Sequence, residues 1–184
     1  IAGVLGRMGK NLIESAQLND GVEIVGVFDK SPISEDHLVS LKLKSDIAIT
    51  GDDAFDRADV VIDFTSPSAL FMFTESAIAH KAALVVGTTG LEQKHFNLLQ
   101  QTSKATKIFY APNMSLGVNS FFQVARDTAA KLKDYDIEII ESHHKFKKDA
   151  PSGTAIKLGE EIADQLGRTN KDFVFDRQQQ VSER

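Results

Sequence analysis

The sequence of 184 residues contains no cysteine. The protein can therefore form no disulfide bond, and it has neither a thiol nucleophile nor a thiolate ligand for a metal ion. An absence of cysteine suits a reducing compartment, and we expect a cytoplasmic protein.

Long apolar runs and an excess of positive charge are also missing. No apolar stretch approaches the roughly 20 residues that span a membrane, and no signal-peptide pattern opens the sequence. The formal net charge of −5 argues against a general nucleic-acid binder. With 42% hydrophobic residues the chain can bury a core of about one to two domains. Because the sequence begins with Ile1, we expect it to be part of a longer chain, incomplete at both ends.

The most unusual stretch runs from Glu141 to Ala155 and contains two adjacent histidines, three lysines and a Pro-Ser-Gly-Thr turn. Before it, the β-branched run Ile137–Ile140 predicts a strand. After it, apolar residues at helical spacing predict a helix from Thr154 to Leu166, which Gly167 ends. The stretch is therefore predicted to be a loop between a strand and a helix.

A helix start can hold an anion, because its first N–H groups lack partners and carry a partial positive charge. Ser152 is a natural N-cap, and Gly153 lets a ligand approach the backbone. His143, His144 and Lys147 place proton donors nearby. The alternative is a solvated basic loop in which Ser152 only caps the helix. A metal site is disfavoured, because adjacent histidines point apart on a strand and no cysteine or acidic cluster completes a ligand set.

The N-terminal residues predict a nucleotide site. Gly3, Gly6 and Gly9 form a turn between a strand end and a helix, and the apolar run Val22–Phe28 predicts the next strand. This order is typical of a dinucleotide-binding fold, in which the pyrophosphate rests on the helix N-terminus. The alternative is a tight turn with close helix packing, because the spacing is not the strict fingerprint.

Asp29 and Lys30 follow that second strand. An acid here would bind the adenosine ribose, and a lysine could accept a 2′-phosphate, so the pair suggests tolerance of both NADH and NADPH. The alternative is two solvated charges at a strand end.

Strands and helices continue to alternate along the chain. Strands are predicted at Asp46–Thr50, Ala58–Phe64, Ala83–Val86 and Lys107–Tyr110, and helices at Leu70–His80, Glu92–Gln101 and Val118–Leu132, whereas Ser31–Lys44 is not assigned. Such alternation predicts a parallel α/β sheet with its ligand at the carboxyl ends of the strands.

The stretch Glu141–Ala155 closely resembles the Glu-x-His-His-x-x-Lys-x-Asp-Ala-Pro-Ser-Gly-Thr-Ala signature of the 4-hydroxy-tetrahydrodipicolinate reductases, also called dihydrodipicolinate reductases. The resemblance covers nearly the whole chain. It departs at Val4, where the family has alanine, in Ser31–Lys44, and in Arg177–Arg184.

The resemblance implies a Rossmann-like parallel-sheet dinucleotide-binding domain at residues 1–114. A smaller α+β substrate-binding domain would occupy residues 115–184. The family is also expected to form homotetramers, without nucleic-acid or membrane partners.

Residue roles follow from the resemblance position by position. His143 and Lys147 are expected to be catalytic, and His144, Gly153 and Thr154 to bind a small dicarboxylate substrate. No metal is expected. The expected contacts of the NADH or NADPH cofactor are Gly3, Gly6, Arg7, Met8, Gly9, Asp29, Lys30, Gly87, Thr88, Thr89, Ala111, Pro112, Asn113 and Met114.

The activity that the resemblance implies is reduction of a cyclic unsaturated dicarboxylate in lysine and diaminopimelate synthesis. Hydride transfer to a conjugated system leaves a carbon that must take a proton, and Lys147 is the expected donor with His143 as its acid/base partner. Two alternatives remain open: a reductase of another imine or carbonyl compound, and a non-catalytic module that senses NAD(P).

Overall fold

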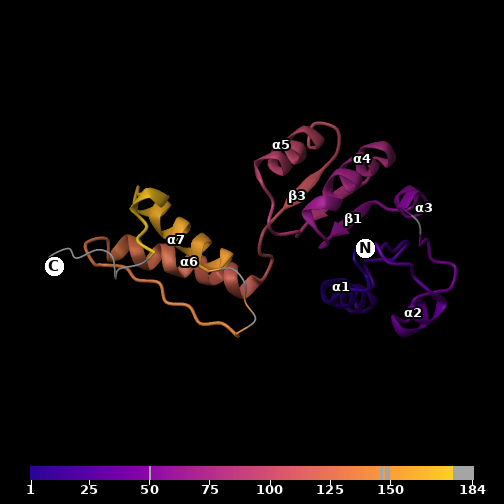
Figure 1. Ribbon diagram of the computed structural model, residues 1–184, viewed down its shortest axis with the longest axis horizontal. Helices are drawn as coiled ribbons and strands as arrows, with labels where there is room; N and C mark the ends of the chain where they lie inside the picture. The colour runs from indigo at the N-terminus through magenta and orange to yellow at the C-terminus, as the bar shows by residue number, and fades with distance from the viewer. Residues whose placement is uncertain (50, 146, 148–149, 176–184) are drawn as a thin grey trace. The chain divides into compact units, whose positions relative to one another are not determined.

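The computed structural model describes residues 1–49, 51–145, 147 and 150–175. The chain divides into two compact units, unit 1 from Ile1 to Pro112 and unit 2 from Asn113 onward, each described here by itself (Figure 1).

Unit 1 has helices packed around a parallel sheet. Its helices are α1 (Arg7–Gln17), α2 (Glu35–Ser40), α3 (Gly51–Asp56), the short 3₁₀ helix η1 (Pro67–Ala69), α4 (Leu70–His80) and α5 (Gln93–Thr102), and its strands are β1 (Val60–Asp63), β2 (Ala83–Val86) and β3 (Ile108–Tyr110). β2 lies between β1 and β3 and pairs in parallel with both. The predicted α/β class with a parallel sheet is confirmed.

Isolated bridges continue this sheet beyond β1. Ala2 forms parallel bridges with both Phe28 and Asp63, and Gly26 forms one with Ala48. The predicted strand Val22–Phe28 is therefore wrong over its first half: the bridges lie at Gly26 and Phe28, whereas the Val22 N–H donates to the Asn19 carbonyl within a turn. Of the predicted strand Asp46–Thr50 only one bridge forms, and Thr50 lies outside the described residues.

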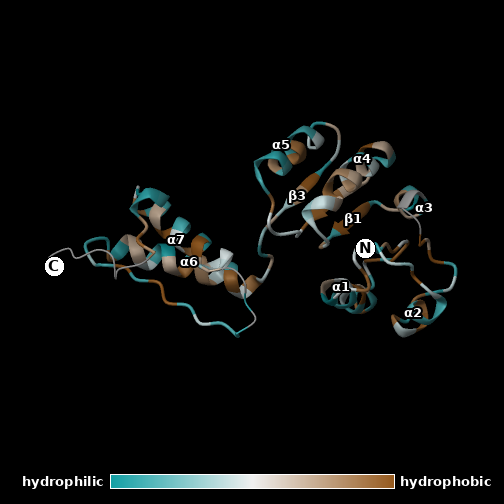
Figure 2. Ribbon diagram, in the orientation of Figure 1, coloured by the Kyte–Doolittle hydropathy of each residue, from teal (hydrophilic) through white to brown (hydrophobic). Residues whose placement is uncertain are grey.

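Side chains alternate between two apolar clusters on opposite sides of this sheet. Ala2 and Phe28 contact the cluster around Phe73 of α4, whereas Val4 and Val27 belong to the cluster formed with α1 and α2. Val27 and Phe28 are neighbours on an extended segment, and their side chains point to opposite faces as successive side chains do. Ala2 and Val4 do not follow this rule, because Gly3 between them has a φ of +74° and is not extended. Figure 2 shows the apolar residues gathered on the strands and α4 and polar residues along α1.

Unit 2 contains α6 (Leu116–Lys131), α7 (Gly153–Gln165) and the short 3₁₀ helix η2 (Asn170–Asp172). α6 packs along α7, and a salt bridge of 2.5 Å between Arg126 and Glu161 joins them. The predicted strand Ile137–Ile140 is wrong in the described chain: the segment is extended but has no ladder partner, and Ile140 is 90% exposed. A β-strand requires hydrogen bonds to an adjacent strand, and the periodicity of a sequence does not show whether such a strand is present.

Candidate active site

Residues predicted to contact a cofactor converge on one edge of unit 1. The carboxyl ends of parallel strands lie at one edge of a sheet. The loops at this edge are those that follow Ala2, Phe28, β1, β2 and β3, because the bridges and ladders between these segments are parallel. The loops at this edge touch: a Cβ added at Gly3 would lie 3.0 Å from Cγ2 of Thr65, and one at Gly87 would lie 2.1 Å from the ring of Phe64. The structure therefore brings together the glycine loop and the loops after β1 and β2.

The glycines of the first loop have different physical roles. Gly3 has a φ of +74°, which other residues rarely adopt. A Cβ at Gly9 would lie 2.1 Å from the carbonyl oxygen of Gly3, so α1 can pack on this loop only with glycine there. Gly6 is the N-cap of α1 and provides no side-chain cap, so the first amides of the helix face outward beside exposed Arg7 and Met8. This is the arrangement that binds a pyrophosphate.

Asp29 is tied to the glycine loop. Its Oδ2 accepts a hydrogen bond of 3.0 Å from the Leu5 N–H, and its Oδ1 accepts one of 3.0 Å from the Ser31 N–H. Each carboxylate oxygen keeps further acceptor capacity, which a ribose hydroxyl could use. Lys30 beside it is exposed.

A fully buried carboxylate that sequence reasoning did not assign links the loops after β1 and β2. Asp63 is 0% exposed, and its Oδ1 accepts from the Thr65 N–H at 2.8 Å and from the Thr65 hydroxyl at 2.6 Å. Its Oδ2 accepts from the Thr88 hydroxyl at 3.1 Å, and that hydroxyl oxygen accepts from the Thr65 N–H at 3.0 Å. The side chain of Thr88 is therefore used inside the protein, and only the exposed Thr89 presents a side chain outward at this loop.

The segment after β3 completes the predicted cofactor set. The Ala111 N–H donates to the Val86 carbonyl at 3.2 Å, which holds it beside β2. Pro112 follows it and is exposed. Asn113 and Met114 belong to unit 2, where Oδ1 of Asn113 accepts from the Ser115 N–H at 2.9 Å and Met114 is 38% exposed.

In unit 2 the first residues of α7 are exposed to solvent. Ser152 is the N-cap, 4% exposed, and its hydroxyl oxygen accepts from the Ala155 N–H at 3.1 Å. Gly153 and Thr154 are exposed, and a Cβ added at Gly153 would meet no atom within 4 Å. The predicted cap is confirmed, and the space over Gly153 leaves room for a carboxylate to approach the helix start.

Glu141 joins this helix start to a predicted catalytic residue. Its Oε1 accepts from the Ser152 N–H at 2.7 Å, and its Oε2 accepts from the Ser152 hydroxyl and lies 2.7 Å from Nε2 of His143. Hydrogen bonds from the Ser152 hydroxyl and N–H, and then from His143, lower the pKa of Glu141 from 4.5 to about 2. Sequence reasoning gave Glu141 no role, although residues two apart on an extended chain share a face with each other.

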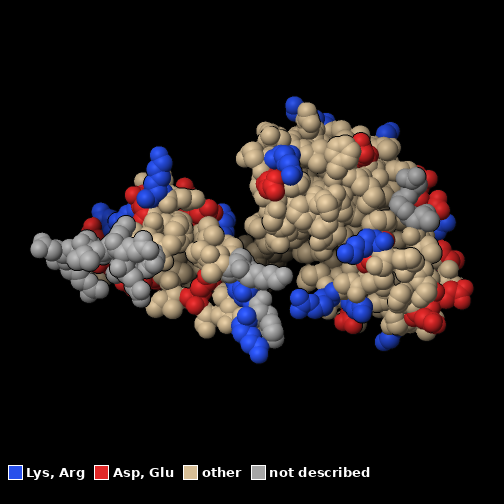
Figure 3. Space-filling model, in the orientation of Figure 1, with Lys and Arg blue, Asp and Glu red and all other residues tan. Residues whose placement is uncertain are grey.

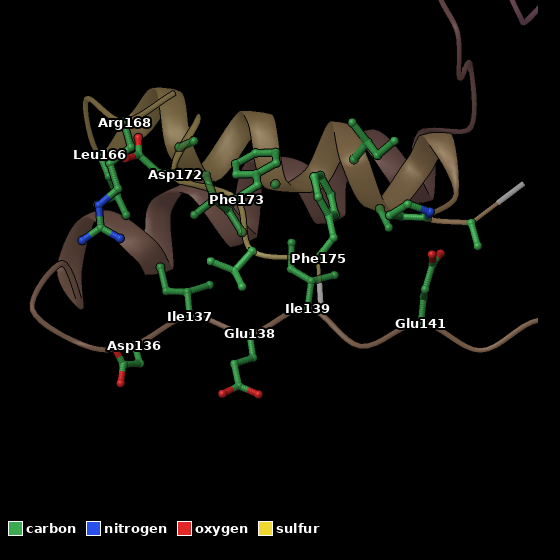
Figure 4. A pocket seen from close by; sticks show the side chains of 18 residues that line it. Asp136, Ile137, Glu138, Ile139, Glu141, Leu166, Arg168, Asp172, Phe173 and Phe175 are labelled. Atoms are coloured by element: carbon green, nitrogen blue, oxygen red, sulfur yellow. The ribbon is translucent and has the colours of Figure 1, made fainter. Parts of the chain in front are cut away.

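The other predicted residues of this loop lie close along the chain. The Lys147 N–H donates to the His144 carbonyl at 3.1 Å, which makes a turn between them. Lys145 is exposed, and Lys148 and the predicted divergence at Arg177–Arg184 lie outside the described residues. Figure 4 shows Glu141 directed toward the start of α7 and Glu138 directed away from the helices.

Within the described residues, no group of three or more His, Asp or Glu side chains could hold a metal ion. No described helix has the length and apolarity that a membrane crossing requires. On the face of unit 1 drawn in Figure 3, blue basic and red acidic side chains are interspersed.

Comparison with known proteins agrees with this geometry. The family model "Dihydrodipicolinate reductase, N-terminus" matches residues 1–114, and "Dihydrodipicolinate reductase, C-terminus" matches residues 117–183. The chain is 40% identical to a 4-hydroxy-tetrahydrodipicolinate reductase of Colwellia psychrerythraea, over the whole chain and 71% of the relative. It is 43% identical to one of Cupriavidus taiwanensis, over the whole chain and 72% of the relative.

A solved structure is similar in fold. It is the dipicolinate-bound dihydrodipicolinate reductase from Paenisporosarcina sp. TG-14, with 29% identity and a TM-score of 0.68. The match covers 89% of this chain and 64% of that one, so the chain spans just under two thirds of the solved protein.

Proposed function

The chain belongs to the dihydrodipicolinate reductase family, and we propose that its protein uses NADH or NADPH to reduce a cyclic unsaturated dicarboxylate in lysine and diaminopimelate synthesis. The predicted family and reductase class are confirmed by the matches. What we propose beyond them is the part that each residue of this chain takes in the reaction.

The cofactor is proposed to lie at the carboxyl edge of the unit 1 sheet. Its pyrophosphate would rest on the uncapped start of α1, where Gly6, Arg7 and Met8 are exposed. Asp29 would accept from the ribose hydroxyls, and Lys30 would pair with the 2′-phosphate of NADPH. The bound cofactor supplies the hydride.

The substrate is proposed to bind at the start of α7. Its carboxylates would accept hydrogen bonds from the N–H groups of the exposed residues Gly153 and Thr154, with His144 as a further donor. The open space above Gly153 is the observation that carries this assignment. The dicarboxylate dipicolinate in the related structure supports the class of ligand.

Proton delivery is proposed to come from the loop before α7. After hydride transfer the substrate holds an electron-rich carbon, and Lys147 would donate the proton to it with His143 as acid/base partner. An ammonium group is charged at neutral pH, so it can also attract a dianion before it reacts.

The direct test is cofactor oxidation by the full-length protein. We expect the absorbance of NADPH or NADH to fall when the aminoaldehyde-derived substrate is added. Cofactor binding without turnover would instead favour an NAD(P)-sensing module, and turnover only with another imine or carbonyl compound would move the protein to a different reductase class.

A further inference from the structure

Glu141 contacts both halves of the predicted substrate site in unit 2, and no role has been assigned to it. Its carboxylate accepts hydrogen bonds from the N–H and the hydroxyl of Ser152, the N-cap of α7. The same carboxylate lies 2.7 Å from Nε2 of the His143 ring. Ser152 is almost fully buried, whereas the side chains of His143 and Glu141 are 40% and 27% exposed. The buried Ser152 at the helix start is therefore the anchored part of this hydrogen-bond network, and Glu141 connects the more exposed His143 ring to it.

The contact determines which ring nitrogen carries hydrogen. With its pKa near 2, Glu141 is ionised at neutral pH, and an ionised carboxylate can only accept hydrogen bonds. The short contact with Oε2 is then a hydrogen bond only if Nε2 of His143 carries the hydrogen. The nitrogen left to take up or release a proton is Nδ1.

We propose that Glu141 is a positioning residue, which holds His143 as its Nε2–H tautomer, with Nδ1 exchanging protons, at a fixed place beside the start of α7. The catalytic role of this positioning rests on the proposed function. Its structural content, the tautomer and the attachment to Ser152, does not depend on any activity.

The geometry explains why one carboxylate serves both purposes. Oε2 receives both the Ser152 hydroxyl and the His143 ring, so a movement of the helix start moves the ring with it. Charge-assisted hydrogen bonds are stronger and shorter than neutral ones, and three of them converge on this group. An acid/base group must lie within hydrogen-bond reach of the substrate. A constant distance between the His143 ring and the helix start that binds the substrate carboxylate therefore favours turnover.

The first experiment needs no variant. We would label the histidines of the full-length protein isotopically and read the tautomer of His143 from the nitrogen chemical shifts of its ring. The spectrum of a His143→Asn variant assigns the signal among the five histidines of this chain. We expect the Nε2–H form in the native protein; an Nδ1–H ring would overturn the proposal whatever the activity of the enzyme.

The second experiment compares Glu141→Gln with Glu138→Gln. Both remove one charge from the same extended segment, but Glu138 is directed away from the helices (Figure 4). In Glu141→Gln we expect a mixture of tautomers and a kcat about 10- to 100-fold lower, the range that applies when a carboxylate that orients a metal-binding histidine is lost. In Glu138→Gln we expect neither change.

A third variant separates positioning from capping. Ser152→Ala removes the hydroxyl but keeps the N–H that Glu141 holds, so we expect the tautomer to stay and kcat to change less than in Glu141→Gln. If Glu141→Gln keeps the native tautomer, or if its kcat matches that of Glu138→Gln, Glu141 does not position His143. Absence of turnover in the native protein would refute the proposed function, while the tautomer measurement would still decide this inference.

Discussion

At Gly153 the structure offers a test of binding that should leave folding intact. A Cβ there meets no atom within 4 Å, so Gly153→Val should fold with an unchanged melting temperature, because valine is no worse than glycine in a helix. The branched side chain would occupy the space over the helix start. We expect dipicolinate affinity, measured by calorimetry, to fall at least about 10-fold, equivalent to about 1.4 kcal/mol.

The matched control is Gly117→Val. Gly117 also lies in the first turn of a helix, and its added Cβ would meet only the Ser115 hydroxyl at 3.9 Å. We expect this variant to bind dipicolinate and NADH normally. Dipicolinate bound equally well by Gly153→Val and by the native protein would place the carboxylate elsewhere.

Lys30 should affect only one of the two cofactors. Asp29 is held by Leu5 and Ser31 whichever cofactor binds, whereas exposed Lys30 can pair with the phosphate that only NADPH carries. Lys30→Ala should therefore raise the KM for NADPH several-fold more than the KM for NADH. Equal changes in both KM values, measured at one salt concentration because surface charges are screened, would refute this role.

At the scale of elements, the contact between α1 and the glycine loop is the most sharply constrained. Gly9→Ala would put a methyl group 2.1 Å from the Gly3 carbonyl oxygen and 2.5 Å from Cα of Val4, both backbone atoms that cannot turn aside. We expect a loss of about 3 kcal/mol in unfolding free energy, at the upper end of overpacking, with weaker NADH binding. Denaturant unfolding measures it.

Gly21→Ala is the control for that variant. Its Cβ would meet the Asn19 side-chain oxygen at 3.2 Å, a flexible group at the surface. Its unfolding free energy should change by less than about 1 kcal/mol. If the two variants were equally stable, the packing of α1 on the loop would not depend on Gly9.

The attachment of α7 to Glu141 should depend on pH. The folded pKa of Glu141 lies below its ordinary value, so its contribution to stability is complete above about 4.5 and is lost as pH falls toward about 2. The protection of the Ser152 and Ala155 amides against hydrogen exchange, measured relative to an unfolded chain at the same pH, should fall over that range in the native protein. In Glu141→Gln this pH-dependent component should be absent, and its persistence would assign the effect to other carboxylates.

Elements with a clear apolar pattern of their own were predictable from the sequence. Elements that form only by pairing with a segment far away in the sequence were not. The helix Leu70–His80 and the strand Ala83–Val86 form where predicted, because both are apolar and buried in unit 1. The runs Val22–Phe28 and Ile137–Ile140 are also rich in apolar β-branched residues, but strand pairing depends on a partner far away in the sequence. The short helix α3 has too few residues for a periodic signal.

The candidate site shows the same division. The N-cap Ser152 could be predicted because a capped helix start is a local pattern, whereas the roles of Gly153 and His143 stay predictions. The hydrogen bonds that the Thr88 hydroxyl makes with the Thr65 N–H and the Asp63 carboxylate could not, because they join residues 23 and 25 positions apart. Burial of a carboxylate at a strand end is visible only once the sheet is formed.

At the scale of the molecule, the proposed function assigns the cofactor to unit 1 and the substrate to unit 2, and the two family models match residues 1–114 and 117–183. The chain spans 71% of the Colwellia relative and 64% of the related solved chain.

Steady-state kinetics of lysine and histidine variants test the central claim most directly. A proton donor acts mainly in the transition state, so Lys147→Ala should lower kcat about 10²- to 10⁴-fold with a smaller change in KM. His143→Ala should be similarly severe, and His144→Ala should act mainly on substrate KM. The exposed Lys145 is the control, and Lys145→Ala should keep nearly native turnover. If Lys145→Ala loses as much kcat as Lys147→Ala, the loop acts only through its charge and the proposed proton transfer from Lys147 is wrong.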